Sequence, residues 1–167
     1  MLTQKQFLII PWMFCFGILI ASTTVQHHYG LAPCPLCMLQ RMMMIAILCT
    51  LTAWWIHNPK QLAKKCYCSM VSVLSLLGLA LAARQTWIQL SPDSAQSSCL
   101  PGLSYLFQNM PWGQALKLAL HGSTECGSVH WSFMGMSIAN WSILSFITIL
   151  ALMIALISTN RICQTTA

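Results

Sequence analysis

Four long apolar runs in this sequence decide which solvent the chain can fold in. They cover residues 7–25, 37–56, 68–90 and 137–158. About 20 helical residues cross the hydrocarbon core of a bilayer, so each run is long enough to form a transmembrane helix. Arg41 and Arg84 are the only charged residues within the runs. We therefore expect an all-α membrane protein built as a four-transmembrane-helix bundle.

The composition excludes an ordinary soluble domain. The 167 residues are 57% hydrophobic and only 6% charged, whereas about a quarter of the residues in a soluble domain are charged. The first run could instead be a secretory signal peptide, but its apolar core is long and only one lysine flanks it, which favours a retained helix. We expect a single integral membrane domain over residues 1–167.

The distribution of lysine and arginine predicts how the helices are oriented. Short loops on the cytoplasmic side of a membrane are enriched in these residues. The residues that fall together on one side are Lys5, Lys60, Lys64, Lys65 and Arg161. The opposite loops contain only Lys117, so we expect both termini to be cytoplasmic. This topology accounts for the net charge of +6, and we expect no nucleic-acid partner.

Two connections fall on the outer side, over residues 26–36 and 91–136. Loops as long as the second one are usually functional or disordered. Its middle, PWGQALKLALHG at 111–122, places four apolar side chains on one helical face: Trp112, Leu116, Ala119 and Leu120. We expect a short surface helix there. It could lie on the membrane surface or pack on the outer end of the bundle, and the sequence leaves both open.

The predicted topology sorts the nine cysteines into three groups. Four face outward, which is an even number on the side where disulfides persist: Cys34, Cys37, Cys99 and Cys126. Cys15 and Cys49 lie within helices, where a cysteine usually acts as a small apolar filler. Cys66, Cys68 and Cys163 fall on the reducing side. The Cys66-Tyr67-Cys68 pair could bind a metal, but no nearby histidine or second cysteine pair completes a site, so spare thiols are favoured.

The stretch Cys34-Pro35-Leu36-Cys37 combines features typical of a reactive thiol. Proline suits the first turn of a helix, so if Pro35 begins the second helix, Cys34 is its cap and Cys37 lies in its first turn. Unpaired N–H groups and the helix dipole stabilise a thiolate there. Arg41 follows one turn deeper on the same face, where its positive charge would stabilise the Cys37 thiolate further. The alternatives are a structural disulfide and an arginine that snorkels to the interface.

At this point the chain resembles the DsbB family, bacterial inner-membrane proteins that re-oxidise the periplasmic thiol oxidase DsbA with quinone. The stretches that carry the resemblance are QHHYGLAPCPLCMLQR at 26–41, ARQTWIQLSPD at 83–93, and CLPGLSYLFQNMPWGQALKLALHGSTECGSVHWSFMGMSIANWS at 99–142. An outer CxxC leading into Gln-Arg, with a second cysteine pair in the long outer loop, makes the resemblance specific. It implies a quinone-dependent oxidoreductase of the inner membrane whose redox loops are periplasmic.

The resemblance also implies a role for each site residue. Reduced DsbA-like protein would attack the Cys99–Cys126 disulfide at Cys99, and the freed Cys126 would attack Cys34. Cys37 would then be released as a thiolate beside the quinone, either ubiquinone or menaquinone, and would form a charge-transfer complex or adduct with it. Arg41 would stabilise negative charge there. The resting protein would contain the Cys34–Cys37 and Cys99–Cys126 disulfides.

Several other polar residues near the outer side have simpler interpretations. Arg84 is expected to hold the end of the third helix through backbone or lipid-phosphate contacts, and a role at the quinone is less favoured. His27 and His28 could shuttle protons to quinone, but interface histidines are usually just solvated. Gln85 and Asn140 are expected to form hydrogen bonds within the bundle.

Two rival functions remain open from the sequence. An enzyme of the vitamin K epoxide reductase type is also a small helical bundle with a quinone-reactive CxxC. In that family the loop cysteines precede the CxxC helix, whereas here Cys34 and Cys37 come first. The other rival is a non-catalytic membrane scaffold, in which a disulfide over the roughly 28-residue loop would contribute about 3.5 kcal/mol by loop-closure entropy.

Overall fold

The computed structural model describes residues 4–30, 34–57, 59–91, 105, 108–122, 132–133 and 135–158. Its long helices are α1 (Gln4–Tyr29), α2 (Pro35–His57), α3 (Gln61–Leu90) and α7 (Ile138–Ser158). All four are long and apolar enough to cross a membrane. The shorter elements are helix α5 (Trp112–His121) and the strands β1 (Ser132–Phe133) and β2 (Met136–Ser137), which pair antiparallel.

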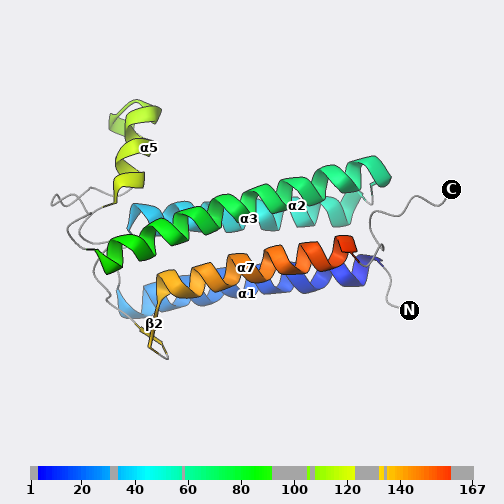
Figure 1. Ribbon diagram of the computed structural model, residues 1–167, viewed down its shortest axis with the longest axis horizontal. Helices are drawn as coiled ribbons and strands as arrows, with labels where there is room; N and C mark the ends of the chain where they lie inside the picture. The colour runs from blue at the N-terminus through cyan, green and yellow to red at the C-terminus, as the bar shows by residue number, and fades with distance from the viewer. Residues whose placement is uncertain are drawn as a thin grey trace.

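The four long helices form one elongated bundle. Helix α2 contacts α1 and α3, and α7 contacts α3 and α1, so the helices close a ring around a shared core. Figure 1 shows that α1 ends, α2 begins, α3 ends and α7 begins at the same end of the bundle. We call this the CxxC end. Helix α5 and the β1–β2 hairpin lie there too, with α5 running across the bundle axis. The expected four-helix bundle is confirmed.

The helix bounds differ from the apolar runs in an instructive way. Helix α3 begins at Gln61 rather than at residue 68, and α1 extends to Tyr29 rather than to residue 25. Lys64 and Lys65 end the apolar run, but lysine is a good helix former and its charge can lie outside the bilayer. The apolar run therefore marked only part of the helix, which begins before the two lysines.

The core lies between the helices, while large apolar side chains also cover the outside. Ile47 and Leu51 of α2, Val71 of α3, and Phe146 and Ile149 of α7 are buried in one cluster. Exposed apolar side chains are equally common, among them Ile10, Ile20, Ile45, Leu76 and Ile147. Lipid tails are as apolar as these side chains, so packing rather than water exclusion must hold the helices together.

One glycine sets the spacing between α3 and α7. A Cβ added at Gly78 would lie 2.3 Å from the ring of Phe146. We therefore expect Gly78→Ala to lower the free energy of unfolding by about 1–3 kcal/mol, the usual cost of overpacking. Thermal unfolding of the detergent-solubilised protein measures this. Gly17→Ala is the matched control, because nothing lies within 4 Å of that Cβ. An equal loss in both variants would contradict the steric explanation.

Side-chain hydrogen bonds join α3 to β2 and to the start of α7 at the CxxC end. Ser137 Oγ donates to Gln89 Oε1 at 2.8 Å, and Thr86 Oγ1 donates to Asn140 Oδ1 at 3.4 Å. The expected hydrogen bonding of Asn140 within the bundle is thus confirmed. These contacts fix the start of α7 against the last turns of α3.

Helix α5 packs on the bundle through small residues. Ala115 and Ala119 are buried, and Ala119 lies in a cluster with Leu39 of α2. The expected short surface helix is confirmed, and most of its predicted apolar face is turned away from the bundle. Only Ala119 of that face is buried, whereas Trp112 is 76% exposed and Leu116 is 44% exposed. A helix with alanines on one side approaches its neighbours closely on that side and turns its larger side chains outward.

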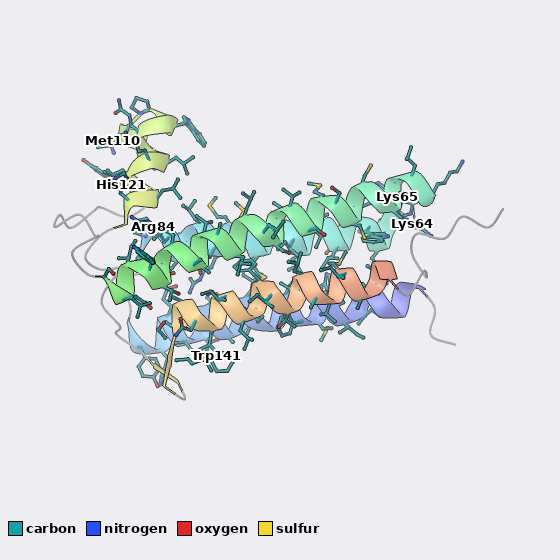
Figure 2. The ribbon with its side chains drawn as sticks, viewed as in Figure 1. Lys64, Lys65, Arg84, Met110, His121 and Trp141 are labelled. Atoms are coloured by element: carbon teal, nitrogen blue, oxygen red, sulfur yellow. The ribbon has the colours of Figure 1, made fainter. Side chains whose placement is uncertain are left out.

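Arg84 ties α5 to α3. Its Nε and one terminal nitrogen donate to the backbone carbonyls of Leu120 and His121, each at 3.3 Å. These carbonyls belong to the last turn of α5, whose final C=O groups lack partners within the helix. Figure 2 shows Arg84 of α3 at the base of α5. The expected backbone contacts of Arg84 are therefore present, but they hold α5 as well as the end of α3.

Candidate active site

The CxxC motif forms the start of α2. The helix begins at Pro35 as predicted, and the amide of Met38 donates to the carbonyl of Cys34 at 3.1 Å, the first helical hydrogen bond. The backbone amide of Cys37 donates to the Sγ of Cys34 at 3.4 Å. Cys34 thus occupies the N-cap, with its sulfur in the place where a serine or aspartate oxygen usually caps a helix.

The two sulfur atoms lie side by side. The Sγ atoms of Cys34 and Cys37 lie 2.9 Å apart. A disulfide bond is about 2.05 Å long, so a small approach of the sulfurs would allow the bond to form. Cys34 is buried and Cys37 is half-buried, which leaves Cys37 as the more accessible of the two. The resting Cys34–Cys37 disulfide stays a prediction.

A buried glutamine from α3 reaches both sulfurs. Gln85 Nε2 lies 3.0 Å from the Sγ of Cys37 and 3.8 Å from the Sγ of Cys34. Its Oε1 accepts a hydrogen bond from Gln40 Nε2 at 2.7 Å. Hydrogen bonding of Gln85 within the bundle is confirmed, but neither its contact with the sulfurs nor Gln40 was predicted. The signal available in the sequence was the presence of two glutamines, Gln40 and Gln85, within apolar runs, because a buried amide requires hydrogen-bond partners.

Arg41 lies one turn beyond Cys37 on α2 and reaches toward α1. One terminal nitrogen donates to the Oε1 of Gln26, and the other donates to the carbonyl oxygen of Ser22 at 2.9 Å. The guanidinium therefore bridges the outer halves of α1 and α2. Gln26 was not singled out from the sequence, since nothing local indicates which helix faces Arg41. Its role toward the Cys37 thiolate remains an expectation.

The two loop cysteines expected to complete the site, Cys99 and Cys126, lie outside the described residues, as does Cys163. The chain that leads to Cys126 can be followed as far as Gly122. Gly122 is buried with φ of 79°, and a Cβ there would lie 2.5 Å from Ile88 and 3.6 Å from Leu36. Gly122, at the end of α5, therefore lies against the first turn of α2.

The other cysteines of the described residues lie elsewhere on the helices. Cys15 is buried in the core, and Cys49 is exposed on α2. Cys66 is exposed while Cys68 is buried, which places the two sulfurs on different sides of α3. His27 and His28 are exposed near the end of α1. Within the described residues, no group of three or more histidine, cysteine or acidic side chains is arranged to hold a metal ion.

Comparison with known proteins identifies relatives along nearly the whole chain. The family model described as "Disulfide bond formation protein DsbB" matches residues 4–156. A disulfide bond formation protein B from Stutzerimonas stutzeri is 40% identical over 134 residues, which cover 78% of this chain and 81% of that protein.

Two further relatives are similar over a longer stretch. Disulfide bond formation protein B 1 of Pseudomonas aeruginosa is 35% identical over 148 residues, or 89% of this chain and 91% of that protein. A relative from Methylococcus capsulatus is 35% identical over 139 residues, covering 83% of this chain and 85% of its own. No solved structure gives a significant match. With its CxxC at the start of a membrane-spanning helix and relatives of this kind along its length, the chain belongs to the DsbB family of disulfide bond formation proteins.

Proposed function

We propose that this protein is a disulfide-forming oxidoreductase that re-oxidises a DsbA-like dithiol protein and passes the electrons to a membrane quinone. The observation that carries the proposal is the sulfur pair at the N-terminus of α2, 2.9 Å apart at the end of a membrane-spanning bundle. A helix N-terminus favours negative charge through its exposed N–H groups and its dipole. A thiolate formed at this point is therefore stabilised before any partner arrives.

Electrons would enter through thiol–disulfide exchange at the loop cysteines. A thiolate of the reduced partner attacks Cys99, forms a mixed disulfide and releases Cys126 as a thiolate. Cys126 then attacks Cys34 in the Cys34–Cys37 disulfide and releases the Cys37 thiolate. The second thiol of the partner displaces Cys99 and leaves the partner oxidised. The freed Cys99 then attacks Cys126 in the Cys34–Cys126 disulfide, which re-forms the loop disulfide and releases Cys34. Each exchange breaks one S–S bond and forms one, so the two electrons remain on Cys34 and Cys37 until these two sulfurs give them to the acceptor and re-form their disulfide.

The path of the long loop supports an exchange between Cys126 and Cys34. Gly122 packs against Leu36, next to Cys37, and Cys126 follows four residues later. An extended chain spans at most about 3.6 Å per residue, so Cys126 lies within roughly 14 Å of Gly122. Four residues of chain are therefore enough for the Cys126 sulfur to reach the sulfur pair at the start of α2.

The residues near Cys37 fit a quinone as the electron acceptor. Cys37 is half-buried, so a lipid-soluble molecule can reach its sulfur. A guanidinium carries five N–H groups, and the bonds of Arg41 to Gln26 and Ser22 leave donors for a quinone oxygen. The quinone, when bound, accepts two electrons and two protons. Ubiquinone and menaquinone both match this chemistry.

The charge distribution supports an orientation in the bacterial inner membrane. Lys64 and Lys65 lie at the end of the bundle opposite the CxxC end (Figure 2). The positive-inside rule favours a cytoplasmic position for that end, so both termini would be cytoplasmic and the redox loops periplasmic. Helix α5, with Trp112 and Leu116 exposed, would then lie at the periplasmic membrane surface, where a partner protein can reach the loop.

The proposal is tested by mixing purified protein, quinone and a reduced DsbA-like protein without oxygen. We expect one quinone to be reduced for each partner dithiol oxidised, followed by quinone absorbance and by thiol counting. The control omits the partner and should show no sustained loss of quinone. If quinone is not consumed with any such partner, a disulfide-stapled scaffold becomes the better interpretation.

A further inference from the structure

Two buried glutamines form a hydrogen-bonded chain that ends on the sulfur of Cys37. Gln40 of α2 is 5% exposed and Gln85 of α3 is 3% exposed. Gln40 donates to the amide oxygen of Gln85 at 2.7 Å, and the amide nitrogen of Gln85 lies 3.0 Å from the Cys37 Sγ. The chain therefore crosses between two helices and reaches the more accessible sulfur of the pair.

The contact with Gln40 orients the Gln85 amide, because the N–H₂ group of Gln40 faces the Oε1 of Gln85. A thiolate has no hydrogen to donate, so it requires a donor opposite it. Because Gln40 presents an N–H to Gln85, the carbonyl oxygen of Gln85 faces Gln40 and its N–H₂ group faces the sulfurs. If the Gln85 amide turned over, its oxygen would face the thiolate and its N–H₂ would face the N–H₂ of Gln40. Both new contacts would be unfavourable.

The Gln85 amide lies closer to one sulfur than to the other. Gln85 Nε2 lies 3.0 Å from Cys37 but 3.8 Å from Cys34, so negative charge on Cys37 receives the shorter hydrogen bond. In thiol–disulfide exchange, the sulfur whose thiolate is better stabilised leaves faster. Attack on Cys34 with departure of Cys37 is favoured by this asymmetry over the reverse.

We propose that Gln85 stabilises the Cys37 thiolate by donating an amide hydrogen bond to it, and that Gln40 is the positioning residue that keeps the Gln85 amide in the required orientation. The proposal rests on the proposed function, in which Cys37 is released as a thiolate. It adds a neutral donor from α3, whereas the two hydrogen bonds of Arg41 described above go to α1. An amide supplies this donor without placing a second charge within the membrane, which would be costly.

The experiment measures the Cys37 thiolate directly, with neither quinone nor partner present. All variants carry Cys34→Ala, so that Cys37 is the only thiol in its stretch of the chain. Its alkylation by iodoacetamide is followed by mass spectrometry of the peptide that contains it, from pH 5 to a pH at which the rate is constant. Alkylation requires the thiolate, so the rate at pH 7 reports how much thiolate is present.

Methionine replacements remove the amides and keep side-chain length. We expect Gln85→Met to slow alkylation at pH 7 by about tenfold, in line with a lost hydrogen bond to a charged group, and to move the pH profile upward. Gln40→Met should slow it a few-fold. The double variant should be no slower than Gln85→Met alone, because Gln40 acts through Gln85. Gln89→Met is the matched control, since Gln89 bonds to Ser137, and it should change nothing.

The limiting rate at high pH separates thiolate stabilisation from access. If the variants only loosened or blocked the site, their rates would differ from the parent at every pH, including the plateau, and the proposal would be wrong. An unchanged pH profile in Gln85→Met would overturn it, and additive effects in the double variant would overturn the role of Gln40. If Gln85→Met does not fold, Gln40→Met tests the same series of hydrogen bonds to Cys37 while Gln85 is still present.

Failure of the proposed function would be seen separately. If the protein never reduces quinone but its variants show the expected alkylation pattern, the role of the two glutamines stands and the proposed function is wrong. If the protein reduces quinone at the normal rate and both methionine variants leave the pH profile of Cys37 alkylation unchanged, the proposed function stands and the role of the two glutamines is wrong.

Discussion

Cys126→Ser is expected to halt turnover and to accumulate a mixed disulfide between Cys99 and the DsbA-like partner. In this variant Cys99 attacks the disulfide of the oxidised partner, and the chain lacks the Cys126 thiol that would displace the partner again. Electrons also have no route from the loop to Cys34, so quinone reduction should fall to the rate measured without protein. Non-reducing electrophoresis and mass spectrometry of the complex measure the trapped species.

Two further variants decide whether the order of attack is right. Cys99→Ser should also stop turnover but should form no mixed disulfide with the partner through Cys126. Cys66→Ser, at the opposite end of the bundle, should form none and keep its activity. Equal trapping by Cys99→Ser and Cys126→Ser would show that the partner does not select Cys99.

Arg41→Met is expected to weaken quinone binding by about tenfold or more, because a charged donor to the quinone oxygen is lost and each 1.4 kcal/mol corresponds to a factor of ten. Arg41→Lys should retain part of the affinity through its charge, although it lacks the planar fork. Equilibrium binding of quinone, followed by quenching of tryptophan fluorescence, measures the change without relying on turnover.

The bonds of Arg41 to α1 make a second explanation possible, and Gln26→Leu distinguishes it. This variant removes one partner of the bridge between α1 and α2 and leaves the guanidinium in place. If Arg41 acts on the quinone, Gln26→Leu should bind quinone nearly as well as the unmodified protein. If the bridge itself is what matters, the two variants should lose affinity together. Unchanged affinity in Arg41→Met would remove Arg41 from the quinone site altogether.

Local chemistry was enough to predict the helices and the position of the CxxC motif. A run of about 20 apolar residues must satisfy its backbone hydrogen bonds internally when it enters lipid, so length and hydropathy alone predict a helix. Proline restricts the backbone at its own position, so the start of α2 at Pro35 could also be predicted. Both inferences depend on neighbours in sequence and on nothing farther away.

The faces that the helices turn toward one another could not be predicted. In a soluble bundle the apolar side marks the core, but here lipid replaces water outside, so Ile47 in the core and Ile45 on the surface look alike in sequence. Gly78 illustrates this, since its contact with Phe146 of α7 follows only from the way α3 and α7 pack. For a related reason the sequence left open how α5 packs, and the structure shows that its small side, with Ala115 and Ala119, packs inward.

The sequence by itself determined the solvent, the number of long helices, and the two thiols at the first turn of α2, because each follows from residues adjacent along the chain. Only the tertiary structure decided what surrounds those thiols. Gln85 is 48 residues from Cys37 and 45 from Gln40, and Arg41 is 15 residues from Gln26. Contacts over such separations depend on which helices become neighbours and how each is rotated about its axis. That choice is made by the packing of all four helices together, so no single stretch of sequence contains it.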